Sequence, residues 1–210
     1  MNDHYYTRNP ASESRPVNCE YTYRGVPLTF QTDAGVFSRG EVDTGTDLLL
    51  NALPEEMHGD ILDLGCGWGV IGIAVSRKWP ETRVTLADVN QRALALSRDN
   101  AKRNHADVAC VESDGMAAFE GQLFDAVVTN PPIRAGKQVI YRMFADAAKC
   151  LKPGGALYLV IRKQQGAESC IKYLQTIFAN VEKISKSGGF WVLKAEVSGL
   201  RSQAVRDGNP

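Results

Sequence analysis

The chain has 210 residues, of which 44% are hydrophobic and 23% charged, and Lys plus Arg balance Asp plus Glu at 24 each. This composition is typical of ordinary globular proteins and argues against fibrous and disordered classes. No apolar run approaches the roughly 20 residues of a membrane-spanning helix, and the first thirty residues lack the apolar core of a secretory signal. We therefore expect a cytoplasmic protein with no membrane partner, in which any polyanion is held by a local basic patch.

Cysteines and histidines are few and scattered. The five cysteines include no C-x-x-C pair and the three histidines stand alone in sequence, so the pattern predicts reduced thiols, no disulfide framework and no metal site. The length suits one main α/β domain but says nothing about oligomeric state.

The N-terminal part of the chain predicts an arm followed by a small extension. Residues 1–18 contain two X-Pro breaks and are expected to form a flexible arm. Tyr21–Tyr23 and Val26–Gln31 flank an Arg-Gly turn and predict a β-hairpin, and a capped helix follows from Asp43 to just before Pro54. The segment 19–53 is too small to form a hydrophobic core of its own. We therefore expect it to pack on residues 54–197 and to complete a single domain, 19–197. Residues 198–210 read as a disordered tail.

From residue 61 onward, strand and helix patterns alternate. Predicted strands are 61–64, 84–88, 108–111, 124–129, 156–161, 181–186 and 190–197, and predicted helices are 70–79, 91–104, 139–151 and 167–178. Lys152-Pro153-Gly154-Gly155 is predicted to be a turn. The pattern predicts a doubly wound, Rossmann-like, mostly parallel seven-stranded sheet that ends in an antiparallel hairpin at its edge.

A glycine-rich loop follows the first of these strands. The sequence Ile61 to Gly72 is an apolar run with an acid, Asp63, and then closely spaced glycines, which is typical of a strand, a tight turn and a helix that faces a nucleotide. Gly67 to Gly72 also fits the dinucleotide pattern G-x-G-x-x-G, so the loop alone leaves the nucleotide open. An acid just before the glycines suits a cationic ligand better than a pyrophosphate.

The next three strands also end in polar residues, which meet at one rim of a parallel sheet. Asp88 lies 21 residues after Gly67, where an acid that binds ribose hydroxyls is expected. Asp114 follows the third strand and can accept from an adenine amine or cap a turn. Asn130-Pro131-Pro132-Ile133 follows the fourth strand; its prolines remove backbone donors, leaving carbonyl and amide oxygens as acceptors for a planar amino group.

With these residues in place, the chain resembles class I S-adenosylmethionine-dependent methyltransferases of the N-P-P group over residues 59–195. It is most similar to the bacterial small-subunit ribosomal RNA guanine-N2 enzymes, which share its Gly35-Val36-Phe37-Ser38 and Asp43-x-Gly45-Thr46 segments. The resemblance implies a cofactor site made of Asp63, Gly65, Cys66, Gly67, Asp88, Val89, Asp114, Gly115, Asn130 and Phe37. It implies catalytic roles for Asn130, Pro131, Pro132 and Ile133.

Two departures from that group concern the acceptor. The fourth motif position, usually an aromatic that stacks on the target base, is Ile133, so stacking would fall to Phe37, Phe190 or Trp191. The best-known guanine-N2 enzymes also carry a second, N-terminal domain for substrate recognition, whereas this chain has the arm and hairpin, which leaves target selection unexplained.

Arg134 and Lys137 follow the acceptor loop and, with Phe37, are the candidate substrate-binding residues; Arg142, Arg162 and Lys163 extend a basic mouth for RNA phosphates. The favoured function is therefore methylation of an exocyclic amine of a nucleobase in RNA, with guanine N2 of small-subunit ribosomal RNA as the leading target. Three alternatives stay open: methylation of a protein glutamine or small-molecule amine, a NAD-dependent oxidoreductase, and an RNA-binding module without turnover.

Overall fold

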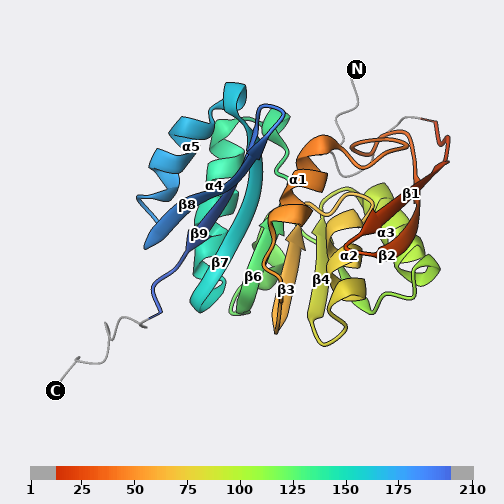
Figure 1. Ribbon diagram of the computed structural model, residues 1–210, viewed down its shortest axis with the longest axis horizontal. Coiled ribbons are helices and arrows are strands. Elements are labelled where there is room, and N and C mark those ends of the chain that lie inside the picture. Colours follow the sequence, from red (N-terminus) through yellow and green to blue (C-terminus); the bar gives the residue numbers. More distant parts are fainter. Residues whose placement is uncertain (1–12, 200–210) are drawn as a thin grey trace.

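The computed structural model describes residues 13–199 and contains the predicted seven-stranded sheet, with strand order β5-β4-β3-β6-β7-β9-β8. Its strands are β3 (Asp60–Leu64), β4 (Arg83–Asp88), β5 (Val108–Glu112), β6 (Phe124–Thr129), β7 (Leu151–Arg162), β8 (Asn180–Ser187) and β9 (Phe190–Glu196). The first five run parallel, and β9 enters antiparallel between β7 and β8 (Figure 1). The predicted fold class is confirmed.

Helices cover both faces of this sheet, and side-chain alternation along the strands explains why (Figure 1). In β6, Ala126 and Val128 face one core cluster and Val127 faces the other. Helices α1 (Thr44–Ala52), α2 (Val70–Lys78) and α3 (Gln91–Arg103) pack on the first face, and α4 (Lys137–Lys149) and α5 (Ala167–Leu174) on the second. Short 3₁₀ turns lie at Ala117–Phe119, Ile133–Ala135 and Lys163–Gln165.

The order of the strands reverses between β3 and β6. From β3 the chain moves outward through β4 to β5, then returns to pair β6 with the other side of β3. In open α/β sheets ligands bind where the order reverses, beyond the carboxyl ends of the strands. The loops after β3 and β6 are the glycine loop and the Asn-Pro-Pro loop, so the topology brings the two motifs to the same place.

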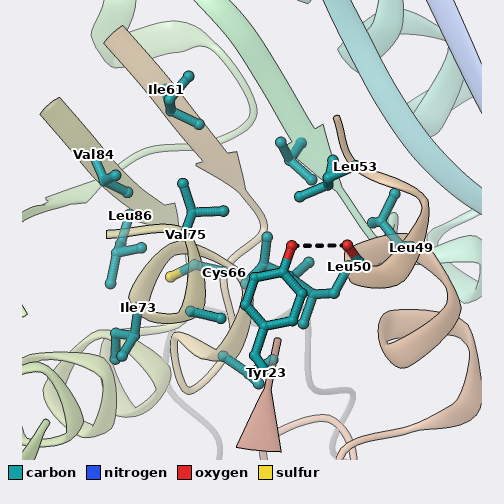
Figure 2. Close-up of a cluster of buried hydrophobic side chains, with 14 of the residues drawn as sticks. Tyr23, Leu49, Leu50, Leu53, Ile61, Cys66, Ile73, Val75, Val84 and Leu86 are labelled. Atoms are coloured by element: carbon teal, nitrogen blue, oxygen red, sulfur yellow. Dashed lines mark hydrogen bonds between the residues drawn. The ribbon is translucent and has the colours of Figure 1, made fainter. Parts of the chain in front are cut away.

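The N-terminal hairpin, β1 (Val17–Tyr23) with β2 (Val26–Thr32), is held on the sheet domain by buried polar contacts. The Tyr23 hydroxyl donates to the Leu50 carbonyl at 2.9 Å, within the apolar cluster shown in Figure 2. The side-chain amides of Asn100, on α3, and of Asn104, which caps its end, each accept from and donate to the backbone of β2. These amides take the place of a neighbouring strand along the open edge of β2.

Several predicted boundaries were wrong. The segment Lys152–Gly155 is not a turn but lies inside β7, where the pairing with β6 shifts register between Phe124 and Ala126. A Cβ on Gly155 would lie 3.0 Å from the Asp125 carbonyl oxygen, so glycine lets β7 pass close to β6 and continue.

The helices predicted at 139–151 and 167–178 end earlier, at Lys149 and Leu174, and the hairpin begins earlier, at Val17. Residues 1–12 of the expected arm and 200–210 of the expected tail lie outside the described residues. None of the helices within residues 13–199 has the length and apolar character that a membrane crossing demands.

Candidate active site

A cleft of about 860 Å³ opens at the carboxyl ends of β3, β4, β5 and β6. It brings together most of the predicted site residues: Phe37, Gly65, Cys66, Gly67, Asp88, Val89, Asp114, Gly115, Asn130, Pro131, Pro132, Ile133 and Arg134. Asp63 and Lys137 do not line it. Asp63 lies beneath the glycine loop, and Lys137 lies on an outer face of α4.

The glycine loop takes the backbone shape that its sequence predicts. The N–H groups of Gly65 and Cys66 both donate to the Ala87 carbonyl, at 2.8 and 2.9 Å, which carries the loop over the end of β4. Gly65 has φ of +74° and Gly67 of +55°, in the region that favours glycine. A Cβ at either position would meet nothing within 4 Å, so both glycines leave the floor of the cleft open to a ligand.

Gly72, the last glycine of the G-x-G-x-x-G pattern, serves packing. A Cβ there would lie 2.0 Å from Cδ2 of Leu86, so only glycine allows α2 to approach β4 this closely.

Asp63 is the most buried carboxylate associated with the site, with 1% of its surface exposed. Its Oδ2 accepts from the Gly72 N–H at 2.8 Å, whereas Oδ1 is buried and has no hydrogen-bond partner among the described residues. Burial, and secondarily the charge of Asp88, raise the pKa of Asp63 to about 7. The carboxylate thus ties the start of α2 to β3.

Asp88 stands at the end of β4 and faces the cleft. Its Oδ2 accepts from Gly67 N at 2.8 Å and its Oδ1 from Asn90 N at 2.8 Å. Burial raises the pKa of this carboxyl, partly offset by these backbone hydrogen bonds. The acid is therefore held in one orientation by the glycine loop and the start of α3, with lone pairs left for the hydroxyls of a ligand.

Asn130 is oriented by the first turn of α1, a contact that the sequence analysis missed. Its Nδ2 donates to Thr46 Oγ1 at 2.9 Å and to Asp43 Oδ2 at 3.2 Å. Because both acceptors bind the amide nitrogen, the carboxamide oxygen is the group that turns toward the cleft. In the sequence, Asp43 and Thr46 were recognised as part of a helix start and of a segment shared with the guanine-N2 enzymes, but not as partners of Asn130. Asp43 does cap the helix, since it accepts from Gly45 N at 2.9 Å.

The two prolines form a tight turn after Asn130. Ile133 N donates to the Pro131 carbonyl at 2.8 Å, and Pro132 has φ −74° and ψ 77°, which is an inverse γ-turn. This hydrogen bond uses one lone pair of the Pro131 oxygen and leaves the other for a ligand. The loop therefore presents acceptor oxygens at the cleft, and one of them, the Pro131 carbonyl, already accepts one hydrogen bond.

Phe37 projects at the mouth of the cleft from a loop that residues of the core hold in place. Its side chain is 39% exposed, and its carbonyl accepts from the Trp68 indole N–H at 2.8 Å. Asn90, fully buried, donates to the Gly35 carbonyl at 3.1 Å. Trp68 and Asn90 gave no signal in the sequence, because their partners are backbone groups more than 30 residues away.

The lining of the cleft also includes a cation over an aromatic ring. The Arg162 guanidinium lies 4.3 Å from the centre of the Phe190 ring, and both residues line the cleft. Phe190 packs closely on the first turn of α1, where a Cβ on Gly45 would lie 2.9 Å from its ring. Phe190 thus lies near the segment that orients Asn130.

The cleft contains neither a metal centre nor an activated thiol. Among residues 13–199, no cluster of His, Cys, Asp or Glu has an arrangement that could hold a metal ion. Burial raises the pKa of the Cys66 thiol, which removes the thiolate that a nucleophile needs at neutral pH. The cleft instead offers carboxylate, carbonyl and amide oxygens that can bind hydroxyl and amino groups, together with the guanidinium groups of Arg134 and Arg162.

Comparison with known proteins identifies the family. The model of the methyltransferase small domain matches residues 27–194. An uncharacterized protein of Bacillus subtilis, YbxB, is 39% identical over 93% of this chain and 99% of its own length. Ribosomal RNA small subunit methyltransferase C of Hahella chejuensis is 41% identical over 65% of this chain, and large subunit methyltransferase G of Cronobacter sakazakii is 33% identical over 89%. The chain spans 41% and 51% of these two ribosomal RNA enzymes.

Among solved structures, a 16S rRNA N2 methyltransferase (RsmC) of T. thermophilus, in complex with AdoMet and guanosine, superposes with a TM-score of 0.78 at 29% identity. The match covers 90% of this chain and 52% of that one. The cleft fits the same cofactor: Gly65 and Gly67 leave an open floor, and the Asp88 carboxylate is directed at the rim where a ribose would lie. The family model covers residues 27–194, so the chain belongs to the methyltransferase small domain family.

Proposed function

We propose that the protein transfers a methyl group from S-adenosylmethionine to an exocyclic amine of a nucleobase in RNA, with guanine N2 of small-subunit ribosomal RNA as the first target. The observation that carries this proposal is the orientation of Asn130. Its amide nitrogen is bound by Thr46 and Asp43, so its oxygen is an acceptor at the cleft beside the Pro131 carbonyl. Two acceptors on neighbouring residues suit the two hydrogens of a planar amine.

These acceptors favour the charge that develops during methyl transfer. An exocyclic amine is a weak nucleophile because its lone pair is delocalised into the ring, and its nitrogen becomes positive as it attacks. Asn130 Oδ1 and the Pro131 carbonyl would bind its two N–H groups and interact more strongly as that charge grows. The bound cofactor supplies a methyl group on a sulfonium, and the amine returns to neutrality by losing a proton to solvent. Holding the amine in line with the methyl is the main contribution of the loop.

Support for an RNA substrate comes from the rim of the cleft and from the relatives. Arg134 is exposed at the rim, and Phe37 and Phe190 both contribute aromatic surface to the lining of the cleft. Proteins usually bind single-stranded RNA with cations that contact phosphates and aromatic side chains that stack on bases. The relatives named for a substrate act on ribosomal RNA, and the T. thermophilus enzyme was solved with guanosine.

Mass analysis of nucleosides tests the proposal directly. Ribosomal and transfer RNA from cells lacking the protein should lack one N2-methylguanosine in 16S rRNA, and the purified protein should restore it with S-adenosylmethionine. The Asn130→Ala variant is the negative control for the restoration. An unchanged nucleoside profile, with no transfer to RNA from the deletion strain, would contradict the RNA substrate.

The large-subunit ribosomal RNA is the second candidate, because in the sequence comparison methyltransferase G of Cronobacter sakazakii aligns over 89% of this chain and methyltransferase C of Hahella chejuensis over 65%. The same nucleoside analysis separates the two when 16S and 23S rRNA are digested separately.

A further inference from the structure

A second surface hollow lies beside the active-site cleft, on the outer face of α4. It measures about 550 Å³ and is lined by Lys137, Tyr141, Arg142, Asp146 and Lys149 of α4 and by Tyr173 of α5, among others; we name it the α4 groove. The residues from α4 that line the groove fall at positions 137 and 138, 141 and 142, 145 and 146, and 149, so they lie along one side of the helix. Val139 and Met143, on another side of α4, line the active-site cleft. The two hollows therefore share one helix.

The floor of the groove is a fixed aromatic pair. The rings of Tyr141 and Tyr173 stack with centres 4.0 Å apart and an interplanar angle of 14°. The Tyr173 hydroxyl donates to the Tyr141 carbonyl at 3.1 Å, and the Tyr141 hydroxyl lies 3.3 Å from Ser169 Oγ. Figure 1 shows α4 and α5 on the same face of the sheet. Both tyrosines are half-buried, so the pair offers a rigid apolar surface that costs little entropy to use.

The rim of the groove carries positive charge. Lys137 Nζ lies 5.1 Å from the centre of the Tyr141 ring, and Arg142 is exposed one residue beyond that tyrosine. Within residues 13–199, neither Lys137 nor Arg142 forms an ion pair, whereas Lys149 is paired with Asp146 at 2.7 Å. The net positive charge is thus concentrated at the end of the groove nearest the cleft.

We propose that the α4 groove binds the single-stranded RNA that flanks the methylated nucleotide, with a base against the Tyr141–Tyr173 pair and phosphates at Lys137 and Arg142. Aromatic faces interleaved with cations bind single strands in this way without reading sequence. Continuity with the cleft through the Arg134 to Lys137 segment favours RNA over an acidic protein. The inference rests on the proposed RNA substrate and deepens it, because a flanking contact would help select a target.

The test is equilibrium binding of labelled oligouridine of about twelve nucleotides, a length within the usual range for single-strand sites. Uracil has no exocyclic amine, so the probe reports flanking contacts rather than the acceptor array. Arg142→Glu should weaken binding about tenfold and make the slope of log K against log salt shallower by about 0.7 or more. The matched control is Arg103→Glu, an exposed arginine near the end of α3, which should leave both quantities unchanged.

Two further probes sharpen the assignment. An abasic strand with the same number of phosphates should bind about tenfold more weakly than oligouridine, because it cannot stack on the tyrosines; equal binding would overturn the stacking role. Poly-glutamate of equal charge should bind more weakly than oligouridine, and equal or tighter binding would overturn the choice of RNA.

Failure of this inference and failure of the proposed function can be told apart. Methyl transfer to ribosomal RNA with no difference between the Arg142→Glu and Arg103→Glu variants would overturn the groove and leave the function standing. Oligouridine binding that depends on Arg142, without methyl transfer to any RNA, would support the groove and remove the function.

Discussion

The two halves of the cleft differ in how they are built. The cofactor half, made of the glycine loop and Asp88, is held by hydrogen bonds that nearby backbone N–H groups donate. Gly65 N donates to the end of β4, and the Asp88 carboxylate accepts from Gly67 N and Asn90 N. The acceptor half depends on side chains from segments distant in sequence, since Asn130 is oriented by α1, more than 80 residues earlier. The cofactor half is therefore held by the ends of neighbouring strands, whereas the acceptor half depends on the packing of α1 beside the end of β6.

The acceptor half should give the largest effect on turnover. Asn130→Ala removes one of the two proposed acceptors, and we expect turnover to fall about 100-fold, as on removal of one preorganised hydrogen-bonding group at a reacting centre. Affinity for S-adenosylhomocysteine should change little. Thr46→Val, which removes one acceptor that orients the Asn130 amide, should give a smaller loss of turnover with the same cofactor affinity. Turnover at the wild-type level in Asn130→Ala would remove the acceptor role.

Asp63, beneath the cofactor half, should have the largest influence on how the free energy of unfolding changes with pH. Its pKa is about 7 in the folded chain against the ordinary 3.8, so the folded state keeps a proton that the unfolded state releases between these values. Raising the pH through this window therefore destabilises the fold. Asp63→Asn does not titrate, and its unfolding free energy relative to wild type should rise by about 2 kcal/mol between about pH 5 and pH 8.

Urea unfolding of both proteins at the two pH values measures this difference. Asp88 is present in both and largely cancels. If the two stabilities change in parallel with pH, Asp63 is ionised throughout and its buried Oδ1 has a partner other than a proton.

Replacing a glycine by alanine can strain the backbone and can also block a bound ligand. Two glycines of this chain allow these two effects to be measured separately. Gly65→Ala places a methyl group into the floor of the cleft, and affinity for S-adenosylhomocysteine should fall about tenfold, a change of about 1.4 kcal/mol. Gly25→Ala is the matched control, because Gly25 also has positive φ and open space but lies in the β1–β2 turn. Both variants should lose about 1 kcal/mol of stability from the left-handed backbone. Calorimetric titration that finds equal affinity in both would mean that the cofactor does not approach Gly65.

This difference between the halves also explains what could be predicted from the sequence. The seven strands and the glycine loop are specified by short-range patterns, and the structure contains them with small changes at the ends of elements. Asp88 and Asn130 were found because strand ends converge on one rim in any parallel sheet. Thr46, Trp68 and Asn90 were missed as supports of the site because they act through hydrogen bonds to distant segments, which leave no periodic signal.

The error at Lys152–Gly155 has the same origin. Pro-Gly-Gly is a strong local signal for a turn, but the neighbouring strand β6 accepts the segment through a register shift, and tertiary pairing overrides the local preference. The position of Lys137 could not be foreseen either. Lys137 is the first residue of α4, and its side chain lines the α4 groove. Arg134, three residues earlier, lines the cleft.

The smallest expected effect concerns Arg134, at the rim of the cleft, and Lys137, in the α4 groove, which follow the Asn130 loop in the chain. Replacing Arg134 and Lys137 together with alanine should weaken RNA binding several-fold and reduce the salt slope by about 1.4, or 0.7 for each lost phosphate contact on a single strand. Affinity for S-adenosylhomocysteine should not change, because neither side chain belongs to the half formed by the glycine loop and Asp88. The double variant Lys102→Ala with Arg103→Ala, exposed cations at the end of α3, controls for net charge. An unaltered salt slope, or an equal change in that control, would assign the contribution of Arg134 and Lys137 to the general field of the protein instead of contacts with phosphates.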